Sequence, residues 1–355
     1  MRVATIIGAR PQFIKCAPVS RELRQITQEV LVHTGQHYDD SMSGVFFRQL
    51  GLPEPDYHLG VGSGSHGEQT GEMLRKIEEI LLKEAPDTVL VYGDTNSTLA
   101  GALAAAKLHL PVAHVEAGLR SFNRWMPEEI NRVMTDHLSE LLFCPTETAV
   151  ENLRREGITK GVHLVGDVMY DALLDSAEGA KQTSTILDRL GLEPRRYLLA
   201  TVHRAENTDQ VPRLQGIMAA FQLLAESGRT IVFPVHPRTR KQIEKLSFDC
   251  PPRLLMIDPV SYLDMVLLEA MAQVVLTDSG GIQKEAYWLA VPCITLRDET
   301  EWIETVDSGW NRLVGTTSDR IVKAVHNASA GSNHSWPWKR GDASKSIVRL
   351  VVQGS

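Results

Sequence analysis

The segment VVLTDSGG at residues 274–281 joins a run of apolar residues to a polar turn that contains two glycines. The apolar run predicts a strand buried on both faces, and the turn opens a predicted helix that continues through residues 285–289. A buried strand that leads through a tight turn into a helix is the repeating unit of parallel α/β sheets. The segment therefore predicts an α/β fold with this turn at the carboxyl end of a strand.

The same alternation of strands and helices continues on both sides of this segment. In the C-terminal half, apolar runs predict further strands at 197–201, 231–235, 254–257 and 293–296. In the N-terminal half, they predict strands at 3–7, 30–33, 88–92, 112–115 and 141–144. Amphipathic patterns typical of helices lie between these runs. Each half is therefore expected to form its own parallel sheet.

At 355 residues, the chain exceeds the length at which one hydrophobic core usually divides. We predict two Rossmann-like doubly wound domains, residues 1–167 and 168–340, which face a central cleft. A linker at 332–342 leads to a final helix in residues 341–355, which is expected to pack back on the first domain. Open α/β sheets bind ligands at the carboxyl ends of their strands, so functional residues should gather there.

The composition restricts the classes of function. The chain has 37 basic and 44 acidic residues, a net charge of -7, and lacks the basic stripe of a nucleic-acid-binding protein. Its four cysteines are far apart, which disfavours a disulfide framework and a cysteine zinc site and fits a reducing compartment. Neither a targeting segment nor a membrane-spanning run is found, so a cytoplasmic protein is expected.

The turn after residue 277 is the strongest candidate for an anion site. Ser279, Gly280 and Gly281 open a helix, where backbone amides and the helix dipole favour a diphosphate. Glu285 lies one turn further on and could accept hydrogen bonds from a ribose. The alternative for the turn is an ordinary glycine-rich turn. The alternative for Glu285 is a solvated acid that stabilises the helix N-terminus.

Acidic residues follow two predicted strands of the first half. Asp94 follows the strand at 88–92, and Glu116 follows the strand at 112–115. Glu128 and Glu129 begin the next helix and could join them for acid–base chemistry, although a capping role for Glu128 is an alternative.

Basic residues also follow predicted strands. Arg10 and Lys15 come after the first strand, although Lys15 could instead be an ordinary surface cation. In the second half, His203 and Arg204 end one strand and His236 ends the next, which suits a diphosphate. The histidine spacing lacks a helical metal-binding pair, so no metal is expected.

The glycine-rich segment at 60–64 lacks a preceding buried strand and the spacing of a dinucleotide fingerprint, and it is predicted to be a loop. The chain also lacks a nucleophile elbow and a P-loop. We therefore expect chemistry without a cofactor.

Taken together, these motifs resemble the non-hydrolysing UDP-N-acetylglucosamine 2-epimerase family, in order and over essentially the whole chain. The matching motifs are GARP at 8–11, TGQH at 34–37, GDT at 93–95, HVEAGLR at 114–120, PEEINR at 127–132, HR at 203–204 and DSGG at 278–281. The resemblance implies the two-domain GT-B-like architecture, a homodimer and a role in polysaccharide biosynthesis.

The resemblance also implies a reaction and its site. UDP is eliminated to give 2-acetamidoglucal and is added back after protonation of C2 from the opposite face. The implied catalytic residues are Asp94, Glu116, Glu128, His203 and Lys15. The implied contacts to the UDP-sugar are Arg10, Arg132, Arg204, His236, Ser279, Gly280, Gly281 and Glu285.

Two departures bear on substrate and regulation. The segment TEWI at 300–303 replaces the usual TERP and resembles the branch that acts on UDP-2,3-diacetamido-2,3-dideoxy-glucuronic acid. Gln36 and His37 match part of a second, activating UDP-N-acetylglucosamine site of some relatives, but Asp39 stands where a glutamine is expected.

Two other classes of function fit the same two-domain architecture. A GT-B glycosyltransferase would share the nucleotide cradle, although three clustered acids exceed what that reaction commonly needs. A sugar-nucleotide sensor would bind UDP without turnover.

Overall fold

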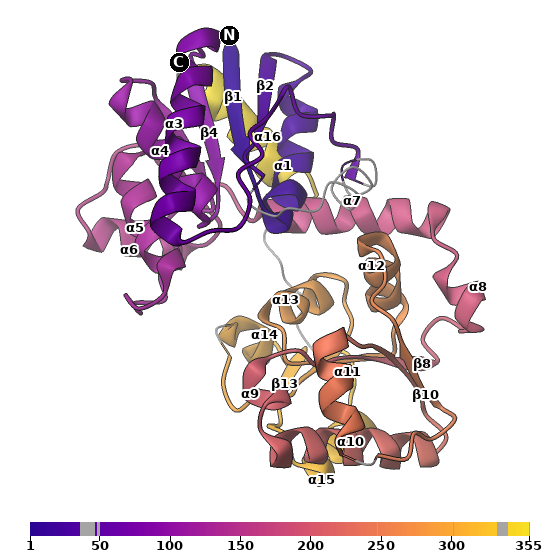
Figure 1. The fold of residues 1–355 in the computed structure, drawn as a ribbon. Coiled ribbons are helices and arrows are strands. Elements are labelled where there is room, and N and C mark those ends of the chain that lie inside the picture. The colour runs from indigo at the N-terminus through magenta and orange to yellow at the C-terminus, as the bar shows by residue number, and fades with distance from the viewer. Residues whose placement is uncertain (36–46, 48–49, 247, 301, 332–339, 355) are drawn as a thin grey trace. The chain divides into compact units, whose positions relative to one another are not determined.

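The computed structural model describes residues 1–35, 47, 50–246, 248–300, 302–331 and 340–354. It divides into two compact units, Met1–Ala172 with Trp338–Ser355, and Leu173–Pro337. Each unit is described separately below (Figure 1). Three parts of the sequence discussed above lie outside the described residues: the partial match to an activating site at Gln36, His37 and Asp39, most of the predicted linker at 332–342, and Glu301 of the TEWI segment.

The first unit is built on a seven-stranded parallel sheet in the order β3-β2-β1-β4-β5-β6-β7. Its strands are β1 (Arg2–Ile7), β2 (Gln28–His33), β3 (Tyr57–His58), β4 (Thr88–Tyr92), β5 (Val112–Val115), β6 (Leu141–Cys144) and β7 (Val162–Leu164). Its helices are α1 (Arg10–Leu23), α3 (His66–Glu84), α4 (Asn96–Lys107), α5 (Pro127–Leu138), α6 (Glu147–Arg155) and α16 (Asp342–Gln353). The central strands are buried along their whole length, as their continuous apolar runs predict.

The second unit contains a six-stranded parallel sheet in the order β10-β9-β8-β11-β12-β13. Its strands are β8 (Tyr197–Thr201), β9 (Thr230–Pro234), β10 (Leu254–Ile257), β11 (Val274–Thr277), β12 (Cys293–Thr295) and β13 (Asn311–Leu313). Its helices are α8 (Ile186–Leu190), α9 (Ala205–Thr208), α10 (Val211–Glu226), α11 (Pro237–Glu244), α12 (Tyr262–Met271), α13 (Gly280–Trp288), α14 (Ile303–Asp307) and α15 (Ser318–His326).

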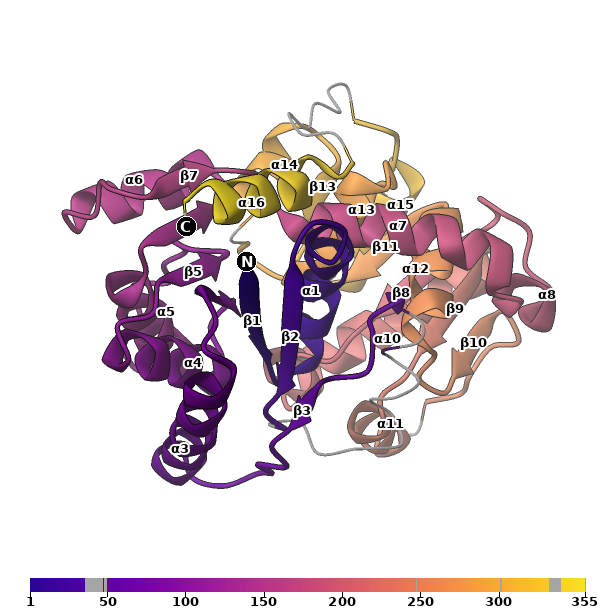
Figure 2. The ribbon, with the colours of Figure 1, turned by 90° about the horizontal axis from the view of Figure 1, so that it is seen from above.

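Two helices depart from a simple division of the chain into an N-terminal and a C-terminal unit. Helix α7 (Val168–Thr183) begins in the first unit and continues past the division at Ala172 into the second. Helix α16 belongs to the first unit and packs against α1, beside which it is drawn in yellow in Figures 1 and 2. Asp171 on α7 accepts hydrogen bonds from the amides of Gly341 (2.8 Å) and Ser344 (2.9 Å), and so caps α16.

In each sheet, successive strands are added first toward one edge and then toward the other, so there is one point where the strand order reverses. In the first unit this point lies between β1 and β4, and in the second between β8 and β11. Loops after such a pair of strands run to opposite sides and leave space for a ligand. The segments after β1, β4, β8 and β11 carry the GARP, GDT, HR and DSGG motifs.

Candidate active site

The loops after β1 and β4 are held together by Gln12 of α1. Its Oε1 accepts hydrogen bonds from the amides of Gly8 (2.8 Å) and Ala9 (2.9 Å), and its Nε2 donates to the carbonyl of Tyr92 (2.9 Å). A Cβ at Gly8 would lie 2.0 Å from Thr34 Oγ1, so only glycine fits there. Arg10 begins α1 directly beyond this turn and is exposed.

Lys15 and Glu116 form an ion pair at the carboxyl ends of the strands, and both side chains are largely buried. Burial alone would lower the pKa of Lys15, but the carboxylates of Glu116 and Asp94 raise it above its usual value. Gly93 lies against the pair, because a Cβ there would be 3.3 Å from both Glu116 Oε2 and Lys15 Nζ. The structure thus brings the predicted residues Lys15, Asp94 and Glu116 into one cluster.

The backbone has a left-handed conformation at Glu116 itself and at the residue directly before Asp94. Glu116 has a φ of 74°, a left-handed conformation that costs free energy in a non-glycine residue and recurs at functional sites. Gly93, directly before Asp94, has a φ of 64°. The tight turns at the ends of β4 and β5 therefore determine where the two acids emerge.

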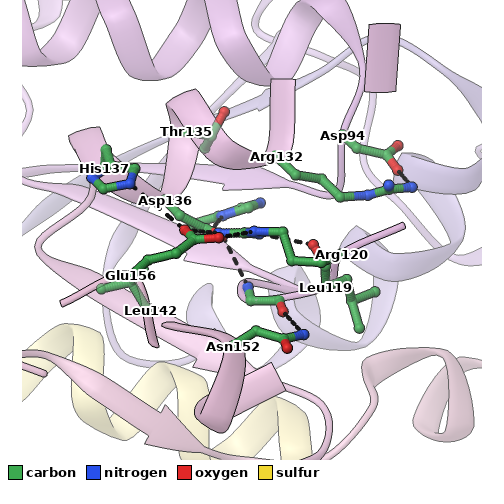
Figure 3. A network of polar contacts seen from close by, with 12 residues as sticks. Asp94, Leu119, Arg120, Arg132, Thr135, Asp136, His137, Leu142, Asn152 and Glu156 are labelled. Carbon is green, nitrogen blue, oxygen red and sulfur yellow. Dashed lines mark hydrogen bonds and ion pairs between the residues drawn. The ribbon is translucent and has the colours of Figure 1, made fainter. Parts of the chain in front are cut away.

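Asp94 is bound from α5 by two neighbouring side chains. Arg132 Nη2 lies 2.7 Å from Asp94 Oδ2, and Asn131 Nδ2 donates to the Asp94 carbonyl (2.9 Å). Figure 3 shows the Arg132 guanidinium directed at the Asp94 carboxylate. Arg132, predicted to contact the sugar nucleotide, therefore pairs with one of the predicted catalytic acids in the described residues.

The two neighbouring glutamates at the start of α5 differ in burial. Glu128, the predicted catalytic residue, is exposed, whereas Glu129 is 2% exposed. Glu129 accepts hydrogen bonds from the amides of Ser121 (2.8 Å) and Phe122 (2.9 Å) and pairs with Arg132 (2.9 Å). Burial alone would raise the pKa of Glu129, but the contacts from Ser121 and Arg132 lower it. Glu129 thus holds the loop before α5 in place.

A buried ionic network lies behind these acids (Figure 3). Asp136 on α5 accepts hydrogen bonds from His114 Nδ1 (2.7 Å), Gly118 N (3.1 Å) and Arg120 Nη1 (2.7 Å). Arg120 also makes a bidentate pair with Glu156, with both distances 2.7 Å. This network was not predicted from the sequence, although a histidine inside the buried strand at 112–115 is a signal that could have indicated it.

In the second unit, Asp278 joins the loops after β8 and β11. Its fully buried carboxylate accepts hydrogen bonds from the amides of His203 (3.1 Å) and Arg204 (3.0 Å) and from Asn207 Nδ2 (3.1 Å). The carboxylate therefore stabilises the backbone that carries His203, a predicted catalytic residue, and Arg204, a predicted contact to the UDP-sugar.

Helix α13 starts immediately after Asp278. Ser279 is its N-cap, with its hydroxyl accepting from Ile282 N at 3.5 Å, and Gly280 and Gly281 form the first turn. A Cβ at Gly281, which is exposed, would contact only Ser279 Oγ, at 3.7 Å. The first turn therefore leaves room for a ligand close to the backbone, at the positive end of the helix dipole.

A pocket of about 200 Å³ adjoins this turn within the second unit. It is lined mainly by apolar side chains together with the two predicted histidines; the lining includes His203, His236, Pro259, Val260, Met265 and Ile282. His236 also caps α11, where its Nδ1 accepts a hydrogen bond from the Arg238 amide (3.3 Å). The pocket thus brings residues that follow β8 and β9 together with the first turn of α13.

Glu285, one turn into α13, is paired with a second carboxyl group. Its side chain is in hydrogen-bond contact with Glu269 of α12, which is 1% exposed. Burial raises the pKa of Glu269, and the neighbouring Glu285 raises it further. Burial likewise raises the pKa of Glu285. Two carboxyl groups in contact retain a proton, which lets one donate to the other. Glu269 was not predicted from the sequence, although an acid within the apolar segment LLEAM could have indicated it.

Within the described part of the chain, no group of three His, Cys, Asp or Glu side chains is arranged to hold a metal ion. Over the same residues, no helix combines the length and apolar character needed to cross a membrane.

Comparison with known proteins places these features in a family. Residues 21–352 match the family described as UDP-N-acetylglucosamine 2-epimerase. A UDP-N-acetylglucosamine 2-epimerase homolog of Methanococcus maripaludis is 56% identical, with 99% of both chains covered. The UDP-2,3-diacetamido-2,3-dideoxy-D-glucuronate 2-epimerase of Pseudomonas aeruginosa is 52% identical, with 92% of this chain and 91% of that protein covered.

The same relationship is found among solved structures. The crystal structure of Methanocaldococcus jannaschii UDP-GlcNAc 2-epimerase in complex with UDP-GlcNAc and UDP has a TM-score of 0.82 and 45% identity, and all of both chains is covered. The predicted α/β architecture with two Rossmann-like parallel sheets, of the GT-B-like type, is therefore confirmed. Together with the match over residues 21–352, this shows that the chain belongs to the UDP-N-acetylglucosamine 2-epimerase family.

Proposed function

We propose that this enzyme inverts C2 of a UDP-linked acetamido sugar and interconverts UDP-GlcNAc and UDP-ManNAc. The observation that carries the proposal is the cluster of Lys15, Glu116, Asp94 and Arg132 at the point where the first sheet reverses its order. Acids held beside cations are placed to exchange protons with a bound substrate. The family membership and the anion-binding turn of α13 supply the nucleotide part of the proposal.

The reaction needs proton transfer at a carbon that is not acidic by itself. We propose that removal of the C2 proton accompanies cleavage of the C1–O bond to UDP, which yields 2-acetamidoglucal and UDP. A proton then adds to C2 from the opposite face while UDP adds back to C1. Asp94, Glu116 and Glu128 are the proposed proton carriers, with Lys15 and His203 in support.

UDP must remain bound while it is detached from the sugar. The proposed contacts to the diphosphate are the backbone of Gly280 and Gly281, the Ser279 hydroxyl, and the cationic residues after the strands, namely Arg10, Arg204 and His236. Glu285 is proposed to accept hydrogen bonds from the ribose, and the pocket beside His203 has a size suitable for the base. Arg132 is proposed to contact the sugar while paired with Asp94.

A second substrate, UDP-2,3-diacetamido-2,3-dideoxy-glucuronic acid, is favoured by two observations. The Pseudomonas aeruginosa enzyme named for that sugar is 52% identical to this chain. Within the TEWI segment, the Trp302 ring lies 4.2 Å from Lys284 Nζ. A cation beside this segment suits a substrate with a carboxylate.

The test is isotope exchange in heavy water with each of the two UDP-sugars, followed by NMR. Deuterium should appear at C2 of both the substrate and its epimer, and the sugar that exchanges faster at equal concentration is the preferred one. No deuterium in any UDP-acetamido sugar would exclude the proposed reaction. UDP release only after addition of an acceptor would instead indicate a glycosyltransferase, and UDP binding without turnover a sensor.

Three further properties are proposed from the family. The enzyme is proposed to act in the cytoplasm, to form a homodimer and to supply a sugar for polysaccharide synthesis. We also propose a division of labour in which residues 1–167 supply the acids and residues 168–340 hold UDP. Light scattering of the purified protein tests the dimer directly.

A further inference from the structure

His114, inside strand β5, makes two contacts that a neutral imidazole cannot make together. Its Nδ1 lies 2.7 Å from Asp136 Oδ1 and its Nε2 lies 2.8 Å from the Gly93 carbonyl oxygen. A carboxylate and a carbonyl are both acceptors, whereas a neutral imidazole has one N–H and one lone pair. In either neutral tautomer, one ring nitrogen would direct its lone pair at a lone pair of an oxygen, with no hydrogen between them. Both ring nitrogens must therefore carry hydrogen.

Asp136 is the anion of this pair. Burial alone would raise the pKa of Asp136, but the contacts with His114 and Arg120 lower it below its usual value. Its other oxygen already accepts hydrogen bonds from the amide of Gly118 and from Arg120. The carboxylate is therefore ionised, and the hydrogen in the contact with His114 belongs to the ring.

The charges around His114 balance only when the ring is cationic. Arg120 pairs with both Asp136 and Glu156, and the side chains of His114, Arg120 and Asp136 are at most 1% exposed. An imidazolium gives two positive and two negative charges, whereas a neutral ring leaves one cation, Arg120, shared between two carboxylates, of which Asp136 is fully buried and Glu156 is 27% exposed. Burial raises the pKa of Cys144 on β6 to about 12, which keeps that neighbouring thiol neutral. His137 lies 3.6 Å from Glu156 and is half exposed.

The Gly93 carbonyl held by His114 belongs to the turn that presents Asp94. The amide of Gly93 donates to the Val115 carbonyl (3.0 Å), so both polar backbone groups of Gly93 are bound from β5. The next carbonyl, that of Asp94, accepts a hydrogen bond from Asn131. A change in the protonation or position of the His114 ring would therefore be transmitted to Asp94 through one residue of backbone.

We propose that His114 is held as an imidazolium and acts as a positioning residue, which sets the place of Asp94 through the Gly93 carbonyl. The charge on the ring follows from its two contacts together with the ionised Asp136 carboxylate, whereas its effect on catalysis rests on the proposed function of Asp94. A catalytic group displaced by about 1 Å can lose a hundredfold in rate, so a fixed turn has a large effect.

The charge is tested by ¹⁵N NMR of the protein with labelled histidine, at a pH of about 8, above the ordinary histidine pKa of about 6.5. The signal of His114 is identified by its absence in His114→Gln. Both ring nitrogens should show the shifts of protonated nitrogen, whereas one unprotonated nitrogen would overturn the proposal. This result is independent of any activity, so it stands even if no sugar is epimerised.

The effect on catalysis is tested with Asp136→Asn and with Glu156→Gln as its matched control. Both variants remove one carboxylate from the same network, but only Asp136 contacts His114. In Asp136→Asn, one ring nitrogen should lose its hydrogen, and kcat for C2 exchange should fall on the order of tenfold with KM nearly unchanged.

The control and the folding check complete the test. Glu156→Gln should retain the doubly protonated ring and a kcat within about twofold of the wild type. Wild-type exchange by Asp136→Asn, or equal losses in both variants, would refute the positioning role. Circular dichroism and UDP binding check that each variant is folded, and His114→Gln is measured in the same way if Asp136→Asn is unfolded.

Discussion

Lys15 and Arg132 each bring a positive charge to a different carboxylate of the first unit. Lys15 pairs with Glu116, and Arg132 pairs with Asp94 at 2.7 Å. Each acid therefore has a cationic partner in the absence of substrate, and that cation can stabilise the charge that develops when a proton moves. Such preorganised charges can account for a large part of a rate enhancement.

The proposed role of Asp94 predicts the effect of replacing its carboxylate by an amide. Asp94→Asn should lower the rate of C2 deuterium exchange by at least about a hundredfold, because the amide cannot take up the proton. UDP affinity measured by calorimetry should stay within about threefold, because most of the proposed nucleotide contacts lie in the second unit. Asp87→Asn, an exposed aspartate just before the same strand, is the control and should exchange at the wild-type rate. Full exchange activity in Asp94→Asn would contradict the role.

The pair of Glu269 and Glu285 predicts how stability depends on pH. Burial raises the pKa of Glu269 above its unfolded value of 4.5, so the folded state binds a proton more tightly than the unfolded state. Stability should therefore fall as the pH rises above about 4.5, through the interval up to the raised pKa. Glu269→Gln keeps a hydrogen-bond donor but does not titrate, so its melting temperature should fall less between about pH 5 and pH 8.

The control for this measurement is Glu244→Gln, which changes an exposed glutamate on α11 of the same unit. Its melting temperature should follow the wild type at each pH. Parallel curves for the wild type and Glu269→Gln would mean that the buried pair does not govern this dependence.

At the scale of single residues, the sequence predicted the cluster only in part. Asp94, Glu116 and Lys15 could be predicted because each follows a strand whose apolar run is unmistakable. The different surroundings of Glu128 and Glu129 could not be predicted, because adjacent residues at a helix start differ only in direction. The partners of Glu129 lie in the preceding loop, whose path no local pattern specifies.

Among the elements, α13 combines a structural and a proposed binding function in its first turn. Gly281 has no steric need to be glycine within the protein, since an added Cβ meets only Ser279 Oγ at 3.7 Å. A side chain would instead occupy the space that we assign to the diphosphate. The glycine is therefore expected to serve the ligand rather than the fold.

This assignment predicts opposite effects on stability and binding. Gly281→Ala should leave the protein as stable as before or more stable by up to about 1 kcal/mol. Its UDP dissociation constant should rise at least tenfold, about 1.4 kcal/mol, by calorimetry. Gly179→Ala, on α7 with no atom within 4 Å of the added Cβ, is the control and should bind UDP normally. Unchanged UDP affinity in Gly281→Ala would place the diphosphate elsewhere.

The strands show which elements a sequence reveals. All strands predicted from apolar runs are present in the described residues, and their ends either coincide with the prediction or differ from it by one or two residues. The strands that were not predicted, β3, β7 and β13, have two or three residues and lie at sheet edges. An edge strand is covered less completely and needs no continuous apolar run, so its sequence resembles that of a loop.

For the molecule as a whole, the main feature is that the first unit is assembled from two separate parts of the chain. Helix α16 returns to pack against α1, and Asp171 caps it through two amides. The second unit, by contrast, is one continuous segment, Leu173–Pro337.

This connectivity predicts an effect confined to one unit. Asp171→Ala should destabilise α16 by about 1–2 kcal/mol, because it removes the cap from two amides. Hydrogen exchange measured by mass spectrometry should become faster in α1 and α16, while β8 and β9 keep their wild-type rates. A uniform increase over both units would show that they do not respond separately.

The return of α16 also has a consequence for synthesis on the ribosome. Every residue of the continuous Leu173–Pro337 unit is translated before α16. The first unit, although translated earlier, waits for α16 and would expose part of α1 in the meantime. The codons for α16 thus govern when the half that carries the acids becomes complete.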